Sequence, residues 1–549
     1  MPPPLLVSLC MIVRDEQDWL AGCLDSVRGL CDELVVVDTG SRDSTVALAG
    51  RAGARVVHFP WCDDFAAARN AGLQQARGEW VLVLDADERL APGDAARLRT
   101  RLASADGPCG MVAIHNAADT TASPEAVLSG DARLGNPQLV PRLFRRTADL
   151  AFQGAVHESV RGWLSRNGGT TWDTGCALVH YGAVPSVRAS KDKQARNVRL
   201  LEKRLLQEPG DFTVHGYLAH EHLRGGEPDK AWAVAEQGWA LVLAASNDPL
   251  RSAARLASAR SLLQLQRGDA AGMLATADQA MAYEGEGPDA LFYKGLAQER
   301  LALAPGADVD ALLVHAAQAY RACLGWAGRA GPPQFVGGAT GWLGRTRLGT
   351  VLLLQGRPAE AQAAFDAALA EAPGTEEAQL GAAESLLESG RPAEALARLE
   401  PLLGSPARPD AALLAARVAE ELGQLQDAQQ LFALARSREK PGYLASHRVL
   451  QHVGMLASLL AYLGKPSAAV GSVGAVCGWM AGQRPTAPVR LPQRDSRNVR
   501  ALVRNLLRAG HMAAVETLLV ADAEQSLPGI HALVKEAVSA LGMGLEEKA

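Results

Sequence analysis

The sequence predicts an α/β domain with a mainly parallel sheet over residues 1–205, followed by an all-α array of helical repeats. In the first part, short uninterrupted apolar runs alternate with helical patterns, as in buried parallel strands joined by right-handed crossovers. From Asp211 onward the chain is rich in Ala and Leu and contains no convincing strand pattern. A six-residue phrase that begins with Gly recurs there at spacings of 34 and 33 residues, and this period indicates two-helix repeats.

Length and composition limit the class of protein. With 549 residues the chain has room for about three or four domains, and 48% hydrophobic with 21% charged residues argues against wholesale disorder. The net charge of −5 and the lack of a Lys/Arg-rich block argue against a nucleic-acid partner. No stretch reaches about 18 uninterrupted apolar residues, so we expect no membrane span.

The N-terminus and the cysteines indicate the compartment. Residues Met1 to Val13 are apolar but lack a basic segment in front, so we expect a first strand rather than a signal peptide. The eight cysteines include no C-x-x-C pair, which favours reduced thiols over disulfides or a zinc site. We therefore expect a cytoplasmic protein.

The α/β part can be followed strand by strand. A strand from Leu5 to Val13 precedes a helix from Gln17 to about Leu30, in which apolar residues recur at helical spacing. A second strand, Leu34 to Val37, ends at Asp38 and is followed by a helix and a third strand at residues 55–59. In nucleotide-binding sheets, a carboxylate in the position of Asp38 binds a ribose hydroxyl or a base edge. A helix cap or a turn is the alternative role for this residue.

The stretch from Trp80 to Glu88 carries the strongest chemical signal. Its first five residues are predicted to form a buried parallel strand that runs into three carboxylates. Because alternate residues of a strand point to opposite faces, Asp85 and Asp87 would share a side, where two oxygen donors suit a divalent cation and a diphosphate. Glu88 would face away and begin the next loop or meet Arg89. A solvated acidic turn is the alternative for the whole stretch.

A helix from Phe65 to about Ala76 precedes this strand and contains Arg69. A buried helical arginine beside a diphosphate pocket would supply positive charge and bidentate hydrogen bonds. The alternative for a lone arginine is a surface ion pair.

Four segments, Ser8–Glu16, Val36–Ser41, Phe65–Asn70 and Leu84–Glu88, together resemble glycosyltransferase family 2. More narrowly, they resemble bacterial members that carry tetratricopeptide (TPR) repeats behind the transferase domain, a group that includes peptide S-glycosyltransferases. The resemblance implies a GT-A-like nucleotide-sugar fold. It also implies that Asp38 contacts the uracil or ribose of the donor and Arg69 its nucleotide side.

The same resemblance assigns further donor and metal contacts. It implies that Asp85 and Asp87 hold a Mn²⁺ or Mg²⁺ ion that bridges the donor diphosphate. The remaining donor-binding residues that it implies are Val13, Arg14, Glu16, Asp85 and Ala86.

The second half of the domain should supply the catalytic base. After a polar stretch at residues 116–138, which we expect to be rich in loops, the segments Arg142–Arg146 and Phe152–Glu158 resemble the same subgroup. Glu158 is the candidate base of an inverting reaction, although the family more often has Asp there, and a structural ion pair with an arginine of the first segment is the alternative. His157 would position substrate or Glu158, or be structural. In several GT-A enzymes a late histidine is the third metal ligand, which implies that role for His180.

The repeat phrase occurs at Gly356–Ala361, Gly390–Ala395 and Gly423–Ala428, and less regularly at Gly226–Ala231 and Gly464–Ala469. Gly ends one helix, and Pro occupies the first turn of the next in most copies. Because one helix pair cannot bury its apolar face alone, the repeats should stack into a TPR-like solenoid with a concave face. That face would bind the acceptor or a partner, or form a homodimer; a stabilising appendage is the alternative.

Three Pro-, Gly- and Arg-containing stretches interrupt the array, namely Ala304–Asp310, Gly328–Gly341 and Gln483–Asp495. We therefore predict a solenoid over residues 206–482, with a linker and a C-terminal helical cap over residues 483–549.

Two classes of function follow. The first is a metal-dependent glycosyltransferase that moves a sugar, with inversion, from a nucleotide-diphosphate donor to a peptide or protein held with help from the repeats. UDP is the donor nucleotide that the resemblance implies. The second is a non-catalytic TPR scaffold with a transferase-like domain, which should have lost part of the set Asp38, Arg69, Asp85 and Asp87. A nucleotidyltransferase is disfavoured because the first strand is not followed by a Gly-rich phosphate loop.

Overall fold

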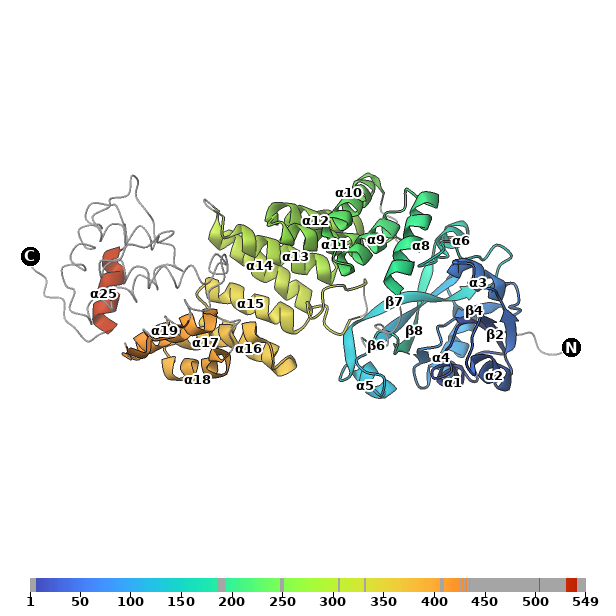
Figure 1. Ribbon diagram of the computed structural model, residues 1–549, viewed down its shortest axis with the longest axis horizontal. Helices are drawn as coiled ribbons and strands as arrows, with labels where there is room; N and C mark the ends of the chain where they lie inside the picture. The colour runs from blue at the N-terminus through green and yellow to red at the C-terminus, as the bar shows by residue number, and fades with distance from the viewer. Residues whose placement is uncertain are drawn as a thin grey trace, which may run out of the picture. The chain divides into compact units, whose positions relative to one another are not determined.

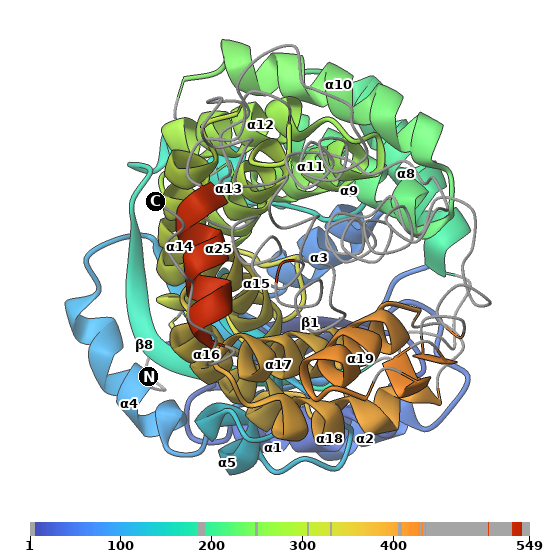
Figure 2. The same ribbon diagram turned by 90° about the vertical axis from the view of Figure 1, so that its left-hand side faces the viewer.

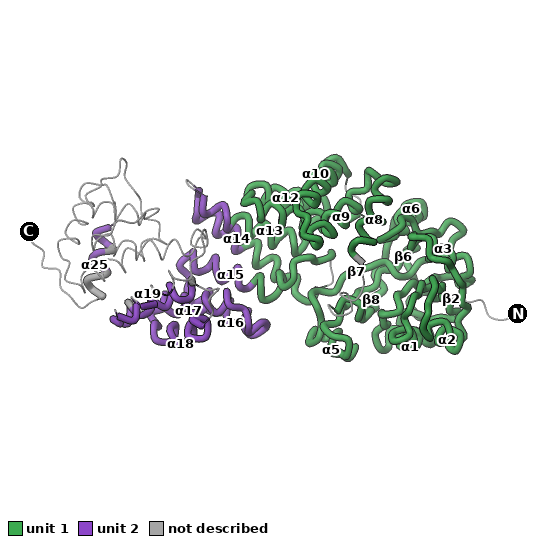
Figure 3. The backbone as a smooth tube through the Cα atoms, in the orientation of Figure 1, with its two compact units in different colours: residues 1–298, 318–344 green, residues 299–317, 345–549 purple. Residues whose placement is uncertain are grey.

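The computed structural model describes residues 6–184, 193–246, 251–304, 307–329, 332–404 and 409–424, the helix Ile530–Ala540 and a few isolated positions between them. The chain forms two compact units (Figure 3): residues 1–298 with 318–344, and residues 299–317 with 345–549. The predicted boundary after residue 205 lies inside the first unit, and the boundary after residue 482 lies outside the described residues.

The described part of the first unit contains one eight-stranded sheet in the order β3-β2-β1-β4-β7-β6-β8-β5. The strands are β1 (Val7–Val13), β2 (Glu33–Asp38), β3 (Arg55–His58), β4 (Trp80–Val83), β5 (Glu88–Leu90), β6 (Cys109–Ala117), β7 (Arg133–Arg145) and β8 (Thr171–His180). Strands β1 to β4 are mutually parallel, and β7 is antiparallel to both β4 and β6. The predicted α/β class is confirmed.

Helices cover both faces of this sheet (Figure 1). They are α1 (Leu20–Ser26), α2 (Thr45–Arg51), α3 (Phe65–Leu73), α4 (Asp94–Arg101), α5 (Pro124–Ser129) and α6 (Arg161–Arg166). Leu9 and Met11 of β1 belong to the core that contains buried residues of α1 and α4, whereas Cys10 belongs to the core on the other side, with residues of α3 and α6. Because both faces of β1 are covered, the strand is apolar without alternation.

The prediction that residues 116–138 are rich in loops is wrong. It contains α5 and the first part of β7, whose residues Arg133 and Leu134 pair with Ala117 and Asn116 of β6. This outer part of the ribbon is half-exposed and polar, so it lacks the continuous apolar pattern by which the buried strands are identified.

Helices follow the sheet, as predicted. In the first unit they are α8 (Lys193–Gln207), α9 (Phe212–Arg224), α10 (Pro228–Ala244), α11 (Ala254–Gln266), α12 (Ala270–Glu284) and α13 (Pro288–Leu301, of which the last three residues belong to the second unit). Helices α9 and α11 lie side by side (Figure 2). Like α13, the helices α14 (Val309–Leu324) and α15 (Trp342–Leu354) have residues in both units. The second unit adds α16 (Pro358–Glu371), α17 (Glu376–Glu388), α18 (Pro392–Leu403), α19 (Pro409–Glu421) and α25 (Ile530–Ala540).

The repeat phrase has the predicted local structure. Pro228, Pro358 and Pro392 occupy the first turns of α10, α16 and α18. Gly356 and Gly390 adopt φ values of 76° and 75°, which favour glycine over residues with a side chain. The copy at residues 464–469 lies outside the described residues, as does most of the predicted cap. Within the described segments, none of the helices combines the length and the hydropathy needed to cross a membrane.

Candidate functional site

The predicted donor residues gather where three parallel strands end. Val13 and Asp38 are register partners at the carboxyl ends of β1 and β2, and Asp85 follows the end of the neighbouring β4. Parallel strands place their carboxyl ends at one edge of a sheet, which is where ligands bind in open α/β folds.

The buried carboxylate of Asp38 is stabilised in its ionised form by hydrogen bonds. It is 5% exposed and accepts hydrogen bonds from the backbone N–H groups of Gly40 and Ser41, at 3.3 and 3.0 Å. Burial alone would raise the pKa of Asp38, but hydrogen bonds from Ser41, Gly40 and His58 outweigh it and hold the pKa below its ordinary value. Asp38 is therefore ionised at neutral pH.

The other residues of this edge contribute differently. Val13 is buried, and its carbonyl oxygen accepts hydrogen bonds from the backbone and the hydroxyl of Thr39. Arg14 is exposed and Glu16 is half-buried, both just beyond the end of β1. Ala86 is 4% exposed and packs into the hydrophobic core, so only its backbone is placed to contact a donor.

The prediction that Asp85 and Asp87 share a face rests on strand alternation, and the strand ends two residues before Asp85. Strand β4 ends at Val83, and a turn follows in which the Glu88 N–H donates to the Asp85 carbonyl oxygen at 3.0 Å. Side chains alternate between two faces only along an extended backbone. Asp85 pairs with two arginines and Asp87 lies beside His180, which also contributes to the lowered pKa of Asp85.

Arg69 joins two carboxylates from distant parts of the chain. From the middle of α3 it donates Nη2–H to Asp85 at 3.0 Å and Nε–H to Glu158. The side chain is 9% exposed, and its Nη1 atom is buried without a hydrogen-bond partner among the described residues. The cation is therefore inside the site rather than in a surface ion pair.

Arg142 of β7 completes the charge network. It donates to Glu88 and, at 3.4 Å, to Asp85. Burial alone would raise the pKa of Asp85, but the charges of Arg69 and Arg142 hold it well below its ordinary value. Desolvation, together with the Asp85 carboxylate, raises the pKa of Glu88 despite the pairing with Arg142.

The expected position of Glu88 is therefore wrong. The residue is 1% exposed and begins β5, and its carboxylate also accepts the backbone N–H of Asp85 at 3.0 Å. Arg89 instead lies over the rings of Trp19 and Tyr181. Glu88 begins a short strand in which residues 88 and 90 are buried, and the period-2 pattern of this strand is the sequence signal that could have indicated a buried Glu88.

His180 lies beside Asp87, as the metal hypothesis requires. The two side chains approach to 3.7 Å between His180 Nε2 and Asp87 Oδ1, and the Tyr181 N–H donates to the Asp87 carbonyl oxygen. His180 Nδ1 lies 2.8 Å from the side-chain oxygen of Asn116 on β6. Because that oxygen can only accept, we infer that Nδ1 carries a hydrogen and that Nε2 is the ring nitrogen on the side of Asp87.

These residues fit a divalent cation in part. Carboxylate oxygen with imidazole nitrogen is a suitable donor set for Mn²⁺. Gly182 keeps the space beside them clear, since a Cβ atom there would lie 2.0 Å from Asp87 Oδ2 and 2.8 Å from His180 Nε2. Asp85 is the exception, because its oxygens pair with Arg69 and Arg142. In the described ranges, no three His, Cys, Asp or Glu side chains converge as a ready metal site.

His157 does not join the carboxylate network. Its ring stacks on Tyr217 of α9 with 3.7 Å between the ring centroids, and the side chain remains exposed. Desolvation by the surrounding chain, then the charges of Arg255 and Arg204, lower the pKa of His157 below its ordinary value. Its neighbour Glu158 is 12% exposed and faces Arg69.

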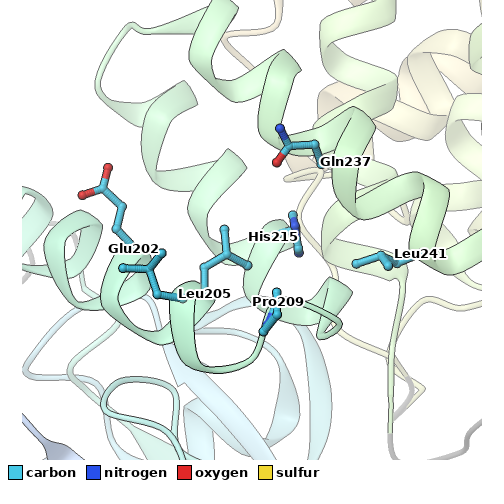
Figure 4. Close-up of a pocket in the computed structure, with 7 residues that line it drawn as sticks. Glu202, Leu205, Pro209, His215, Gln237 and Leu241 are labelled. Carbon is cyan, nitrogen blue, oxygen red and sulfur yellow. The ribbon is translucent and has the colours of Figure 1, made fainter.

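One concavity of the first unit lies away from the predicted donor residues. An open hollow of about 680 Å³ lies on α8, α9 and α10 and contains none of the predicted site residues (Figure 4). Leu205 and Leu241 line it, as does Leu206, whose side chain is 86% exposed. A second hollow, of about 780 Å³, is lined by Asn70 and Phe152, which are close in sequence or in space to Arg69. The site must therefore be identified from its charges rather than from a deep cavity.

Two family models match the chain. Residues 8–153 match glycosyl transferase family 2, and residues 352–405 match a tetratricopeptide repeat. The chain thus carries a family 2 glycosyltransferase domain at its N-terminus and TPR repeats in its C-terminal half, as the motifs and the repeat period predicted.

Curated relatives share these parts. A TPR repeat-containing protein of Synechococcus elongatus is 46% identical over 154 residues, 28% of this chain and 35% of the relative. The glycosyltransferase SunS of Bacillus subtilis is 26% identical over 206 residues, 36% of this chain and 45% of the relative. The matches thus span less than half the length of either relative.

A tetratricopeptide repeat protein from Parabacteroides merdae aligns with a TM-score of 0.31 and 17% identity, covering 45% of this chain and 87% of that chain.

Proposed function

We propose that the protein is a glycosyltransferase that moves a sugar from a nucleotide-diphosphate donor, UDP in the first instance, to a peptide or protein acceptor. The observation that carries this proposal is Arg69, a buried cation held between Asp85 and Glu158 with one N–H-bearing nitrogen unpartnered. A buried, unsatisfied guanidinium nitrogen is costly, and a phosphate oxygen would satisfy it. The family 2 domain at residues 8–153 supports the same chemistry.

Each group of the site has a role in this reaction. Asp38 binds the ribose or base of the donor, and the exposed Arg14 and half-buried Glu16 border the same strand edge. Arg69 stabilises the negative charge that develops on the leaving diphosphate. Asp85 and Glu158 hold Arg69 in place from two sides, and Glu88 with Arg142 fixes the turn that carries Asp85.

A divalent cation, Mn²⁺ or Mg²⁺, would be held by Asp87 and His180. When bound, it would supply Lewis-acid stabilisation to the diphosphate. Asn116 orients His180 for this role, and Asp85 serves the cation indirectly by holding Arg69.

Glu158 is the proposed base that accepts the proton of the acceptor nucleophile. Glu158→Gln keeps an oxygen that can accept from Arg69 but cannot take a proton. We expect sugar transfer to fall by at least about 100-fold, the scale of general base catalysis, with donor binding retained. The measurement is product formation beside calorimetric titration with UDP. Transfer near the wild-type rate would show that Glu158 is not the base and that its role is limited to holding Arg69 in place.

The test of the proposed function is nucleotide-sugar turnover by the purified full chain. A panel of nucleotide sugars is incubated with Mn²⁺, and release of nucleoside diphosphate is measured. We expect release from one donor and its loss in EDTA, with recovery on adding Mn²⁺. No turnover or binding of any donor would favour the alternative of a TPR scaffold, and undiminished turnover in EDTA would remove the metal from the proposal.

Partners and compartment follow from the same proposal. The TPR repeats support a peptide or protein acceptor, and a second copy of the chain is the other partner that such a surface could bind. The described cysteines are free and mostly buried, which supports a reducing compartment such as the cytoplasm.

A further inference from the structure

A second arginine without a hydrogen-bond partner lies beside the helix that carries Arg69. Arg196, in the first turn of α8, has its guanidinium carbon 5.6 Å from the ring centre of Phe65 on α3. Its Nε atom is buried, and among the residues that the structure describes its guanidinium makes no hydrogen bond or ion pair. The ring contact uses the charge of Arg196 but none of its five N–H donors. These donors are therefore available to a ligand.

Other arginines of α8 have carboxylate partners. Arg199 donates to Asp63 at 2.9 Å although its side chain is 62% exposed, and Arg204 donates to Glu208 at 3.1 Å. Arg196 is more buried than Arg199, yet no carboxylate of the described segments pairs with it. A buried N–H group without a partner raises the free energy of the folded state, so an anion that accepts from Arg196 would bind favourably.

The position of Phe65 places Arg196 on the ligand side of the sheet. Phe65 is the first residue of α3, which follows the carboxyl end of β3. A helix that follows a parallel strand begins at the edge where ligands bind in open α/β folds. Arg69 lies four residues further along the same face of α3. The ring that Arg196 covers is therefore one helical turn from Arg69.

Contacts of Phe65 also connect Arg196 to the loop that carries the proposed base. The Phe65 N–H donates to the carbonyl oxygen of Ala155 at 2.9 Å, and its ring packs against the core cluster that contains Val156. Glu158 follows in the same loop and contacts Arg69. A base must lie near the anomeric carbon, where the acceptor attacks. Arg196 thus adjoins the sugar end of the donor site rather than its nucleoside end at Asp38.

We propose that Arg196 binds the β-phosphate of the donor, the phosphate that carries the sugar, together with Arg69. This inference rests on the proposed function and adds a residue from the first helix after the sheet to the donor site. In the transfer step the bond between the anomeric carbon and the β-phosphate oxygen breaks, and its electron pair remains on that oxygen while the acceptor nucleophile bonds the carbon. Two guanidinium groups then stabilise the negative charge of the leaving diphosphate.

The experiment compares the affinities for UDP and UMP, because only UDP has a β-phosphate. Both nucleotides are titrated by calorimetry into the full-length protein with Mn²⁺, as wild type, Arg196→Met, Arg196→Lys and Arg199→Met. Methionine keeps an unbranched apolar chain over Phe65 and removes the charge. Arg199→Met is the matched control, since Arg199 lies one turn away on the same helix and pairs with Asp63. The melting temperature and donor hydrolysis of each variant are measured in parallel.

We expect Arg196→Met to weaken UDP binding by about 10- to 100-fold, the range for losing a hydrogen bond to a charged group. The affinity for UMP should stay unchanged, and Arg196→Lys should recover part of the UDP affinity. Arg199→Met should change neither nucleotide. A merely structural role of Arg196 would weaken UDP and UMP alike.

Unchanged UDP affinity in Arg196→Met, or an equal loss for UDP and UMP, would overturn the inference while the proposed function stands. If the wild type does not bind UDP, the titrations are repeated with GDP and ADP and their monophosphates. Binding of none of these diphosphates by the wild type would contradict the proposed function itself, and the inference would fall with it.

Discussion

Arg69→Ala is expected to lower the turnover of the nucleotide-sugar donor by at least about 100-fold, the scale of removing a principal charge-stabilising group. The substitution removes the cation that faces the leaving diphosphate. It also removes the cation that Asp85 and Glu158 both contact, and Asp85 then keeps only the longer contact with Arg142 among its described ion pairs. The measurement is kcat/KM for donor hydrolysis and for transfer.

The controls separate charge from geometry. Arg69→Lys keeps the charge but cannot bond Asp85 and Glu158 in the same fork, so its turnover should lie between the wild type and Arg69→Ala. Arg28→Ala removes an arginine whose side chain is 83% exposed and pairs with the exposed Asp25, and it should leave turnover unchanged. A folded Arg69→Ala protein with turnover close to the wild type would contradict the role given to Arg69.

Local sequence patterns were sufficient to predict the strands in the parallel half of the sheet. β1, β2 and β4 are short, mostly buried and mostly apolar, so their ends, and with them Val13, Asp38 and Asp85, could be located from the sequence. The same holds for the repeats, where Gly and Pro mark the turn between two helices in each copy.

Other parts of the site depend on contacts that no local pattern contains. Arg142 reaches Asp85 because β7 returns antiparallel beside β4, and Asn116 reaches His180 because β6 and β8 are register neighbours. Strand pairing over such separations is decided by the whole sheet rather than by the sequence of one strand. The turn at residues 85–88 likewise cancels the alternation that placed Asp85 and Asp87 on one face.

His157 shows why the domain boundary matters for the site. Its ring and its carbonyl oxygen are held by α9 and α8, which follow the predicted end of the α/β domain at residue 205 or span it. The first helices after the sheet therefore shape the loop that carries Glu158.

Asp87→Ala is expected to weaken Mn²⁺ binding in the presence of UDP by at least about 100-fold and to lower donor turnover on the same scale. Asp87 contributes the carboxylate that lies against His180 and over Gly182, so its loss removes the anionic half of the proposed pair. His180→Gln should weaken Mn²⁺ binding as well. Asn116→Leu, which leaves the ring in place but removes its hydrogen-bond partner, should weaken it by about 10-fold.

The same titration distinguishes Asp85 from Asp87, which the sequence pattern treats as equivalent. Because Asp85 pairs with Arg69 and Arg142, Asp85→Asn should lower turnover while leaving the Mn²⁺ affinity, measured by electron paramagnetic resonance, within a few-fold of the wild type. His115→Gln, on the same strand as Asn116 but in contact with Arg133, serves as the control that should change neither quantity. If Asp85→Asn and Asp87→Ala weakened Mn²⁺ equally, the two carboxylates would have to converge on the ion when the donor binds. The turn after β4 would then have to rearrange, and Arg69 would release Asp85 as it takes up the diphosphate.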